Sequence, residues 1–195
     1  MALTVKSLSA DVSVAAQLGP EAMAEAAAAG FRSVVNSHGH FDHSGGLRAA
    51  VAEGATVVTS AANVPYFERA FATPNGIRPD RLAQTGRPVR FVAVGERMAM
   101  TDSTRAIELH AIAGAPHAES FLMVYLPEER LLIEADAFTP GAANAAPPAT
   151  PNPYHLNLIE NIERLRLPVN RIVPLHGRVV PLADLYTAAG KNSPR

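Results

Sequence analysis

The stretch that decides the fold of this chain is NSHGHFDHSGGL, residues 36–47. It places His38, His40, Asp42 and His43 within six consecutive positions. Imidazole and carboxylate groups add little to a hydrophobic core, but they are donors that zinc prefers. A cluster of four such donors at this spacing therefore predicts a metal site.

The order of the donors within this cluster predicts two metal ions. His38 and His40 occupy alternate positions and can point towards one ion. Asp42 and His43 can then point towards a second ion nearby. Two ions about 3.5–4 Å apart can share one activated water molecule. We expect two zinc ions per chain, and iron or manganese would accept the same donors.

Composition limits the other functions that this chain could have. Its 195 residues suffice for one domain with a sizeable core, which we expect to span residues 1–195. The formal net charge of −1 argues against binding to nucleic acid or to an anionic membrane. Cysteine is absent, which excludes thiolate ligands, cysteine nucleophiles and disulfides. The first residues lack the pattern of a signal peptide, so we expect a cytoplasmic protein.

The apolar pattern around the cluster predicts an α/β domain, because strands and helices alternate there. A strand at 31–37 precedes the cluster, and a helix at 47–53, a strand at 55–60 and a helix at 63–71 follow it. A turn-rich surface connection and an antiparallel meander come next. The runs expected in the meander are residues 89–94, 97–101, 105–112, 121–126 and 130–135, and the later elements are a helix at 156–167, a strand at 171–177 and a helix at 181–190.

Three further donors lie downstream, each where a predicted strand leaves the core. His117 lies between two strands, Asp136 ends an apolar run, and His176 ends the strand at 171–177. Residues at strand ends commonly build the sites of α/β proteins. We therefore expect these three side chains to complete the metal site.

The string His-x-His-x-Asp-His, followed downstream by His, Asp and His at strand ends, resembles the metallo-β-lactamase superfamily. The resemblance runs from about residue 34 to residue 189, and the order of the ligands agrees throughout. It implies an α/β fold, the metallo-β-lactamase-like αββα sandwich. Only 37 residues precede the first histidine, so we expect a shortened first sheet.

The resemblance also assigns the ligands to two ions. It implies that His38, His40 and His117 hold the first ion, that Asp42, His43 and His176 hold the second, and that Asp136 bridges both.

The N-terminal segment carries a second resemblance. Residues 11–36 resemble the opening β-α-β unit of a phosphatase-like domain found fused to some metallo-β-lactamase-like proteins. That phosphatase needs a Cys-x5-Arg loop, which a chain without cysteine cannot provide. We therefore expect residues 1–36 to form an atypical structural segment.

These resemblances imply a hydrolase that acts on small molecules. A hydroxide bridging two zinc ions would attack an ester, thioester, lactone or amide-type bond. Asp42 would be catalytic, because besides binding metal it could orient the nucleophile and transfer a proton. Arg178 and Tyr154 are the candidate substrate-binding residues, since both follow ligands in the chain. Strands missing from the first sheet would expose an edge, so we also predict a homodimer.

Two alternatives remain open from the sequence. A shortened sandwich could bind metal too loosely for catalysis, which would make the chain a non-catalytic metal-binding remnant. A mononuclear iron dioxygenase of the same superfamily would need fewer ligands. Flavin-linked di-iron members typically have Glu at the position of His40, so the sequence argues against that branch.

Overall fold

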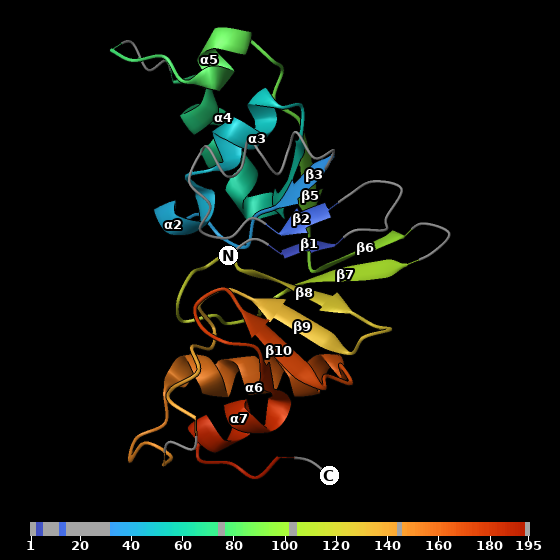
Figure 1. Ribbon diagram of the computed structural model, residues 1–195, viewed down its shortest axis with the longest axis vertical. Helices are drawn as coiled ribbons and strands as arrows, with labels where there is room; N and C mark the ends of the chain where they lie inside the picture. Colours follow the sequence, from blue (N-terminus) through green and yellow to red (C-terminus); the bar gives the residue numbers. More distant parts are fainter. Residues whose placement is uncertain are drawn as a thin grey trace. The chain divides into compact units, whose positions relative to one another are not determined.

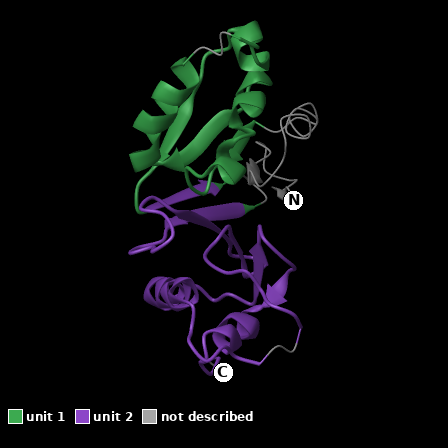
Figure 2. Ribbon diagram, turned by 90° about the vertical axis from the view of Figure 1, so that its left-hand side faces the viewer, with its two compact units in different colours: residues 1–96, 101–105 green, residues 97–100, 106–195 purple. Residues whose placement is uncertain are grey.

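The computed structural model describes residues 3–5, 12–14, 32–73, 77–101, 105–143 and 146–193. The chain divides into two compact units, the first made of residues 1–96 and 101–105, the second of residues 97–100 and 106–195 (Figure 2). Compact halves can fold as one domain, so the single domain predicted over residues 1–195 stays a prediction.

The sheet of the first unit has the strand order β1-β2-β3-β4-β5 (Figure 1). The first pair is antiparallel, and each later pair is parallel. Each parallel connection after β3 contains helical segments, as parallel strands require. The strands are β1 (Leu3–Val5), β2 (Val12–Val14), β3 (Ser33–Val35), β4 (Thr56–Ser60) and β5 (Phe91–Val94).

Helices cover one face of this sheet. Val34 and Val57 are register partners on β3 and β4, and therefore point to the same face. Both belong to one buried cluster with Leu47, Phe67 and Leu82, which come from three different helices. The helical segments of this unit are α2 (Phe41–Ser44), α3 (Leu47–Ala52), η1 (Ala61–Asn63), α4 (Val64–Ala72) and α5 (Arg81–Thr85).

The sheet of the second unit has the strand order β11-β10-β9-β8-β7-β6 (Figure 1). Neighbours β7, β8 and β9 pair antiparallel, whereas β9 and β10 pair parallel. Helix α6 (Pro153–Leu165) lies in the connection between the two parallel strands, and α7 (Leu182–Ala188) follows β11. The strands are β6 (Arg97–Thr101), β7 (Ala106–Ala111), β8 (Leu122–Leu126), β9 (Leu131–Glu134), β10 (Arg171–Pro174) and β11 (Val180–Pro181).

Most predicted elements are present, but the predicted meander is wrong at its first strand. Residues 91–94 do not pair with the next strand along the chain; as β5 they add to β4 in parallel. The connection from β4 to β5 contains the predicted helix at 63–71, here α4, and also the short helix α5, which lies in the stretch predicted as a surface connection. Asp80 caps α5 by accepting a hydrogen bond from Ala83 N. Together, η1, α4 and α5 form the crossover that a parallel pair needs.

The helix of the β-α-β unit expected within residues 11–36, and most of the rest of that segment, lie outside the described residues, so both stay predictions. Among the described residues, no helix combines the length and apolar character needed to cross a lipid bilayer.

Candidate metal centre

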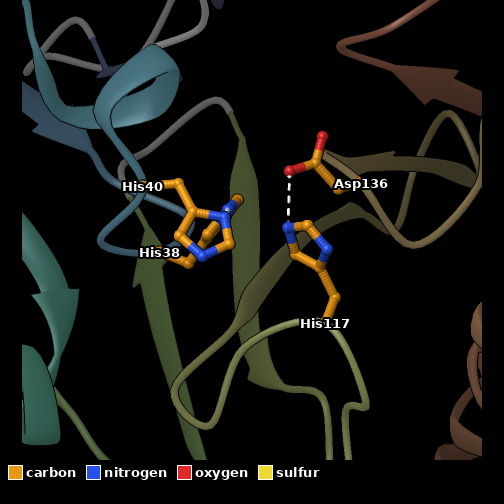
Figure 3. Close-up of side chains that lie close together, drawn as sticks. All are labelled: His38, His40, His117 and Asp136. Atoms are coloured by element: carbon orange, nitrogen blue, oxygen red, sulfur yellow. Dashed lines mark hydrogen bonds and ion pairs between the residues drawn. The ribbon is translucent and has the colours of Figure 1, made fainter.

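The loop after β3 brings two histidine rings of the first unit together. His38 Nε2 lies 3.0 Å from His40 Nδ1, and the two ring centroids are 4.5 Å apart (Figure 3). His38 is fully buried, and its Nδ1 lies 3.1 Å from Ser37 Oγ. A ring whose Nδ1–H donates to a hydroxyl keeps its Nε2 lone pair for a metal ion. The predicted pair His38 and His40 therefore has facing donor atoms.

Helix α2 carries the other two donors of the cluster. His43 Nε2 lies 3.2 Å from Asp42 Oδ2, and the His43 ring centroid lies 4.5 Å from that of His38. The His43 side chain is buried, whereas 51% of the Asp42 side chain is exposed. All four predicted donors of the first unit thus lie along one short segment. His40 and Asp42 are the exposed members, whereas His38 and His43 are buried.

Asn36 fixes the shape of this segment, a role that the sequence reading missed. Its side chain is fully buried, and Nδ2 donates to the carbonyl oxygens of His38 at 2.7 Å and of His43 at 3.1 Å. The Asn36 amide oxygen accepts a hydrogen bond from Thr59 Oγ1 at 3.0 Å. One amide thus joins both ends of the ligand segment to strand β4. The sequence feature that could have indicated this role is a polar residue at the end of an apolar strand.

In the second unit, one carboxylate faces two imidazoles. Asp136 Oδ2 lies 2.8 Å from His117 Nε2, an interaction drawn in Figure 3. The other oxygen, Oδ1, lies 2.8 Å from His176 Nε2. All three side chains are partly buried, with exposed fractions of 15 to 28%. The three downstream donors predicted from strand ends therefore do come together.

Glu134 forms hydrogen bonds with the turn from which Asp136 projects. It is the last residue of β9 and is 2% exposed. Its Oε2 accepts hydrogen bonds from the N–H groups of Ala137 at 2.8 Å and Phe138 at 3.0 Å. Burial raises the pKa of Glu134 well above its usual value, although these two N–H groups oppose the shift.

His176 projects from the end of β10, the strand parallel to β9. Leu175 N donates to Glu134 O at 2.9 Å, which continues the ladder to the residue before His176. Gly177 follows with φ of 133°, a conformation that favours glycine. A Cβ at this position would lie 3.0 Å from Pro140 Cδ. Glycine at position 177 thus allows the chain to turn sharply away from the strand directly after His176.

The two predicted substrate-binding residues lie in different surroundings. Tyr154, in the first turn of α6, presents its ring edge-on to His117, with centroids 5.5 Å apart. Arg178 donates to Gly141 O and, at 3.1 Å, to Asp184 Oδ2. It lines a cavity of about 430 Å³ with residues of the loop after Phe138 and of α7. Tyr154 thus contacts a predicted ligand, whereas Arg178 ties a loop to a helix.

The chemistry of both donor sets fits a divalent transition metal. Imidazole nitrogens and carboxylate oxygens make up each set, which suits zinc, iron or manganese. The charge of the donors also suits a divalent cation, because each unit contributes a carboxylate and imidazoles that bind metal in their neutral form. The donors are His38, His40, Asp42 and His43 in the first unit, and His117, Asp136 and His176 in the second.

Comparisons with known proteins identify the family. The family model of the metallo-beta-lactamase superfamily matches residues 18–176. No protein of curated function matches the chain in sequence.

Solved structures share the fold at low sequence identity. A metallo-beta-lactamase from Pontibacter korlensis is 18% identical with a TM-score of 0.69, over 97% of this chain and 85% of that one. Another from Hirschia baltica is 16% identical with a TM-score of 0.66, over 97% and 84% of the two chains. The rubredoxin:oxygen oxidoreductase of Desulfovibrio gigas is 18% identical with a TM-score of 0.69, over 96% of this chain and 51% of that one.

These likenesses confirm the predicted fold class, the α/β fold of metallo-β-lactamases, and the family match spans all seven residues of the ligand motif. The chain belongs to the metallo-β-lactamase superfamily.

Proposed function

We propose that this protein is a metal-dependent hydrolase that uses two zinc ions and acts on small molecules. The proposal joins the donors of both units around one dinuclear centre. The first ion would take His38, His40 and His117, the second would take Asp42, His43 and His176, and Asp136 would serve both.

The observation that carries this proposal is the arrangement around Asp136. Each of its two carboxylate oxygens faces a different imidazole Nε2, and both distances are 2.8 Å. A carboxylate that bridges two ions presents one oxygen to each of them, beside the other ligands of that ion. The arrangement supports the assignment of His117 and His176 to different ions.

Two bound zinc ions would supply Lewis acidity and make water nucleophilic at neutral pH. The chain's own residues would do the rest. Asp42 is half exposed, so its carboxylate can exchange a proton with solvent while the buried His43 keeps it oriented. Tyr154 packs against His117 and would exclude water from that side of the ring.

The proposed substrates are esters, thioesters, lactones or amide-type compounds. Each has a carbonyl carbon that an activated water can attack and a carbonyl oxygen that a metal ion can polarise. Arg178 remains the proposed contact for an anionic substrate group, and Tyr154 the proposed aromatic contact.

Purification without chelator, metal analysis and an assay panel would test the proposal. The panel holds a lactone, a thioester, a β-lactam and a phosphodiester. Two zinc ions per chain with turnover of at least one carbonyl substrate is the expected result. His38→Ala and His176→Ala should each lower the zinc content, whereas Asp184→Asn, outside both donor sets, should leave it unchanged.

Iron chemistry is the second candidate, because one similar structure is that of a chemotaxis sensor with a peroxy di-iron species. The donor set accepts iron as well as zinc. Iron in the purified protein with oxygen uptake and no hydrolysis would favour this candidate. Two zinc ions without any turnover would instead favour a metal-binding protein that lacks catalysis.

A further inference from the structure

Glu134 is a buried acid that the proposed chemistry does not use. One carboxyl oxygen, Oε2, accepts the N–H groups of Ala137 and Phe138. The other oxygen, Oε1, is buried without a hydrogen-bond partner among the described residues. Burying a carboxyl group is costly unless it makes contacts that an apolar side chain cannot make. The two accepted N–H groups are contacts of that kind.

These contacts shape the segment that carries Asp136. Ala137 and Phe138 are the two residues directly after Asp136, so their N–H groups fix the backbone on its C-terminal side. On the N-terminal side, Glu134 itself is held by the ladder between β9 and β10, where it is the register partner of Pro174. Asp136 therefore projects from a turn in which Glu134 fixes both ends. Its backbone belongs to the strand ladder before the turn, and its carboxyl group accepts the N–H groups after Asp136.

The same residue also reaches the strand that carries His176. The carbonyl oxygen of Glu134 accepts the N–H of Leu175 at 2.9 Å, next to His176 in the chain. A shift of the turn would change the distance from Asp136 Oδ1 to His176 Nε2, now 2.8 Å. A displacement of about 1 Å is enough to weaken a metal site severely.

We propose that Glu134 is a positioning residue, whose carboxyl group holds the turn at residues 134–138 so that each oxygen of Asp136 faces one imidazole. The metal part of this proposal rests on the proposed function. The part that concerns the turn does not.

Two substitutions separate the role of the Glu134 carboxyl group as a hydrogen-bond acceptor from the effect of its side-chain size. Glu134→Gln keeps an oxygen that can accept both N–H groups and is nearly the same size. Glu134→Met keeps the length and the apolar packing but has no comparable acceptor. Glu108→Met is the control, since Glu108 is a largely buried carboxyl group of the same unit that bonds Arg97 and His110 instead.

Zinc affinity by chelator competition and the absorption spectrum of the cobalt(II)-substituted protein give the metal readouts. We expect Glu134→Met to weaken zinc binding by about 10- to 100-fold and to alter the cobalt spectrum, as loss of a residue that orients a ligand does. Glu134→Gln and Glu108→Met should both stay within about threefold of the wild type. Wild-type affinity and spectrum in folded Glu134→Met would overturn the proposal.

Hydrogen exchange at the Ala137 and Phe138 amides tests the turn without any metal. These amides should be protected in the wild type and in Glu134→Gln, and should exchange faster in Glu134→Met. If Glu134→Met does not fold, Glu134→Gln decides: weakened zinc binding with intact protection would refute the acceptor role. If the wild type binds no metal, the proposed function fails, while unchanged exchange in Glu134→Met would separately refute the role of Glu134.

Discussion

His176 Nε2 lies 2.8 Å from Asp136 Oδ1, although a proline-rich loop and helix α6 separate the two residues in the chain. The parallel pairing of β9 with β10 brings them together, because each residue lies just beyond the end of its strand. Neighbouring parallel strands end at the same edge of a sheet, so residues that follow them become neighbours.

Asp136→Ala tests the shared-ligand role directly. Removal of the carboxylate takes away a ligand from both proposed ions, so zinc should fall from two ions to no more than one per chain. Hydrolysis, measured as kcat/KM, should fall by more than about 100-fold. Metal analysis and kinetics on the same preparation check both effects. Retention of two tightly bound ions would contradict the bridging assignment.

Asn36→Leu should destabilise the first unit, because the side chain is buried and makes three hydrogen bonds. The carbonyl groups of His38 and His43 would lose their donor, at a cost of about 1–3 kcal/mol for each group left unsatisfied. Urea unfolding followed by circular dichroism measures the loss. Thr59→Val, which removes the hydroxyl that Asn36 accepts from, is the milder control. An equal loss in both variants would show that the two carbonyl contacts do not matter.

Gly177→Ala should disturb the exit from β10. Its φ of 133° is strained for alanine, and the new Cβ would lie 3.0 Å from Pro140 Cδ. We expect a loss of about 1–3 kcal/mol in the free energy of unfolding, and a lower zinc affinity because His176 is adjacent. Gly95→Ala is the matched control, since a Cβ there meets nothing within 4 Å. Similar effects of the two substitutions would reject the steric argument.

Substitutions of Arg178 and Asp184 test whether the Arg178 guanidinium binds the substrate or only anchors the loop. Arg178→Ala should raise KM for anionic substrates and leave KM for neutral ones unchanged if the guanidinium binds the substrate. Asp184→Ala breaks the same ion pair but keeps the guanidinium, so KM for anionic substrates should not rise. A parallel rise in both variants and for both substrate types would assign Arg178 to loop anchoring alone.

Asp80→Asn should lower stability in a pH-dependent way. The hydrogen bond from Arg48 holds the pKa of Asp80 below its usual value, with further help from Ala83 N. A lowered folded-state pKa adds stability above the unfolded-state pKa, and this stability is lost as the pH falls through the folded-state value. The substitution should therefore cost more at pH 7 than near about pH 3.

Asparagine can still cap α5, so this variant isolates the ion pair, whose effect we expect to stay below about 1 kcal/mol. Thermal unfolding at both pH values checks the difference. A cost that does not change with pH would mean that the Arg48–Asp80 pair adds no stability.

The sequence by itself was sufficient to predict the family and the candidate metal donors of this protein. His38, His40, Asp42 and His43 could be read as a metal motif because they are close in the chain and their side chains have little other use. His117, Asp136 and His176 could be selected because each follows an apolar run. Helices and strands with a clear apolar period were also predictable from local pattern.

Only the tertiary structure decided how distant segments pair. The pairing of Asp136 with two histidines depends on strand register. The parallel pairing of β5 with β4 was not predictable from the short spacing of the strands that follow β5. The hydrogen-bond partners of Asn36 and Glu134 could not be predicted from the chain, because they are backbone groups that folding brings within hydrogen-bond distance. The chemistry of a side chain can be read from the sequence at its own position. The partners of buried polar groups depend on contacts between residues that are distant in the chain.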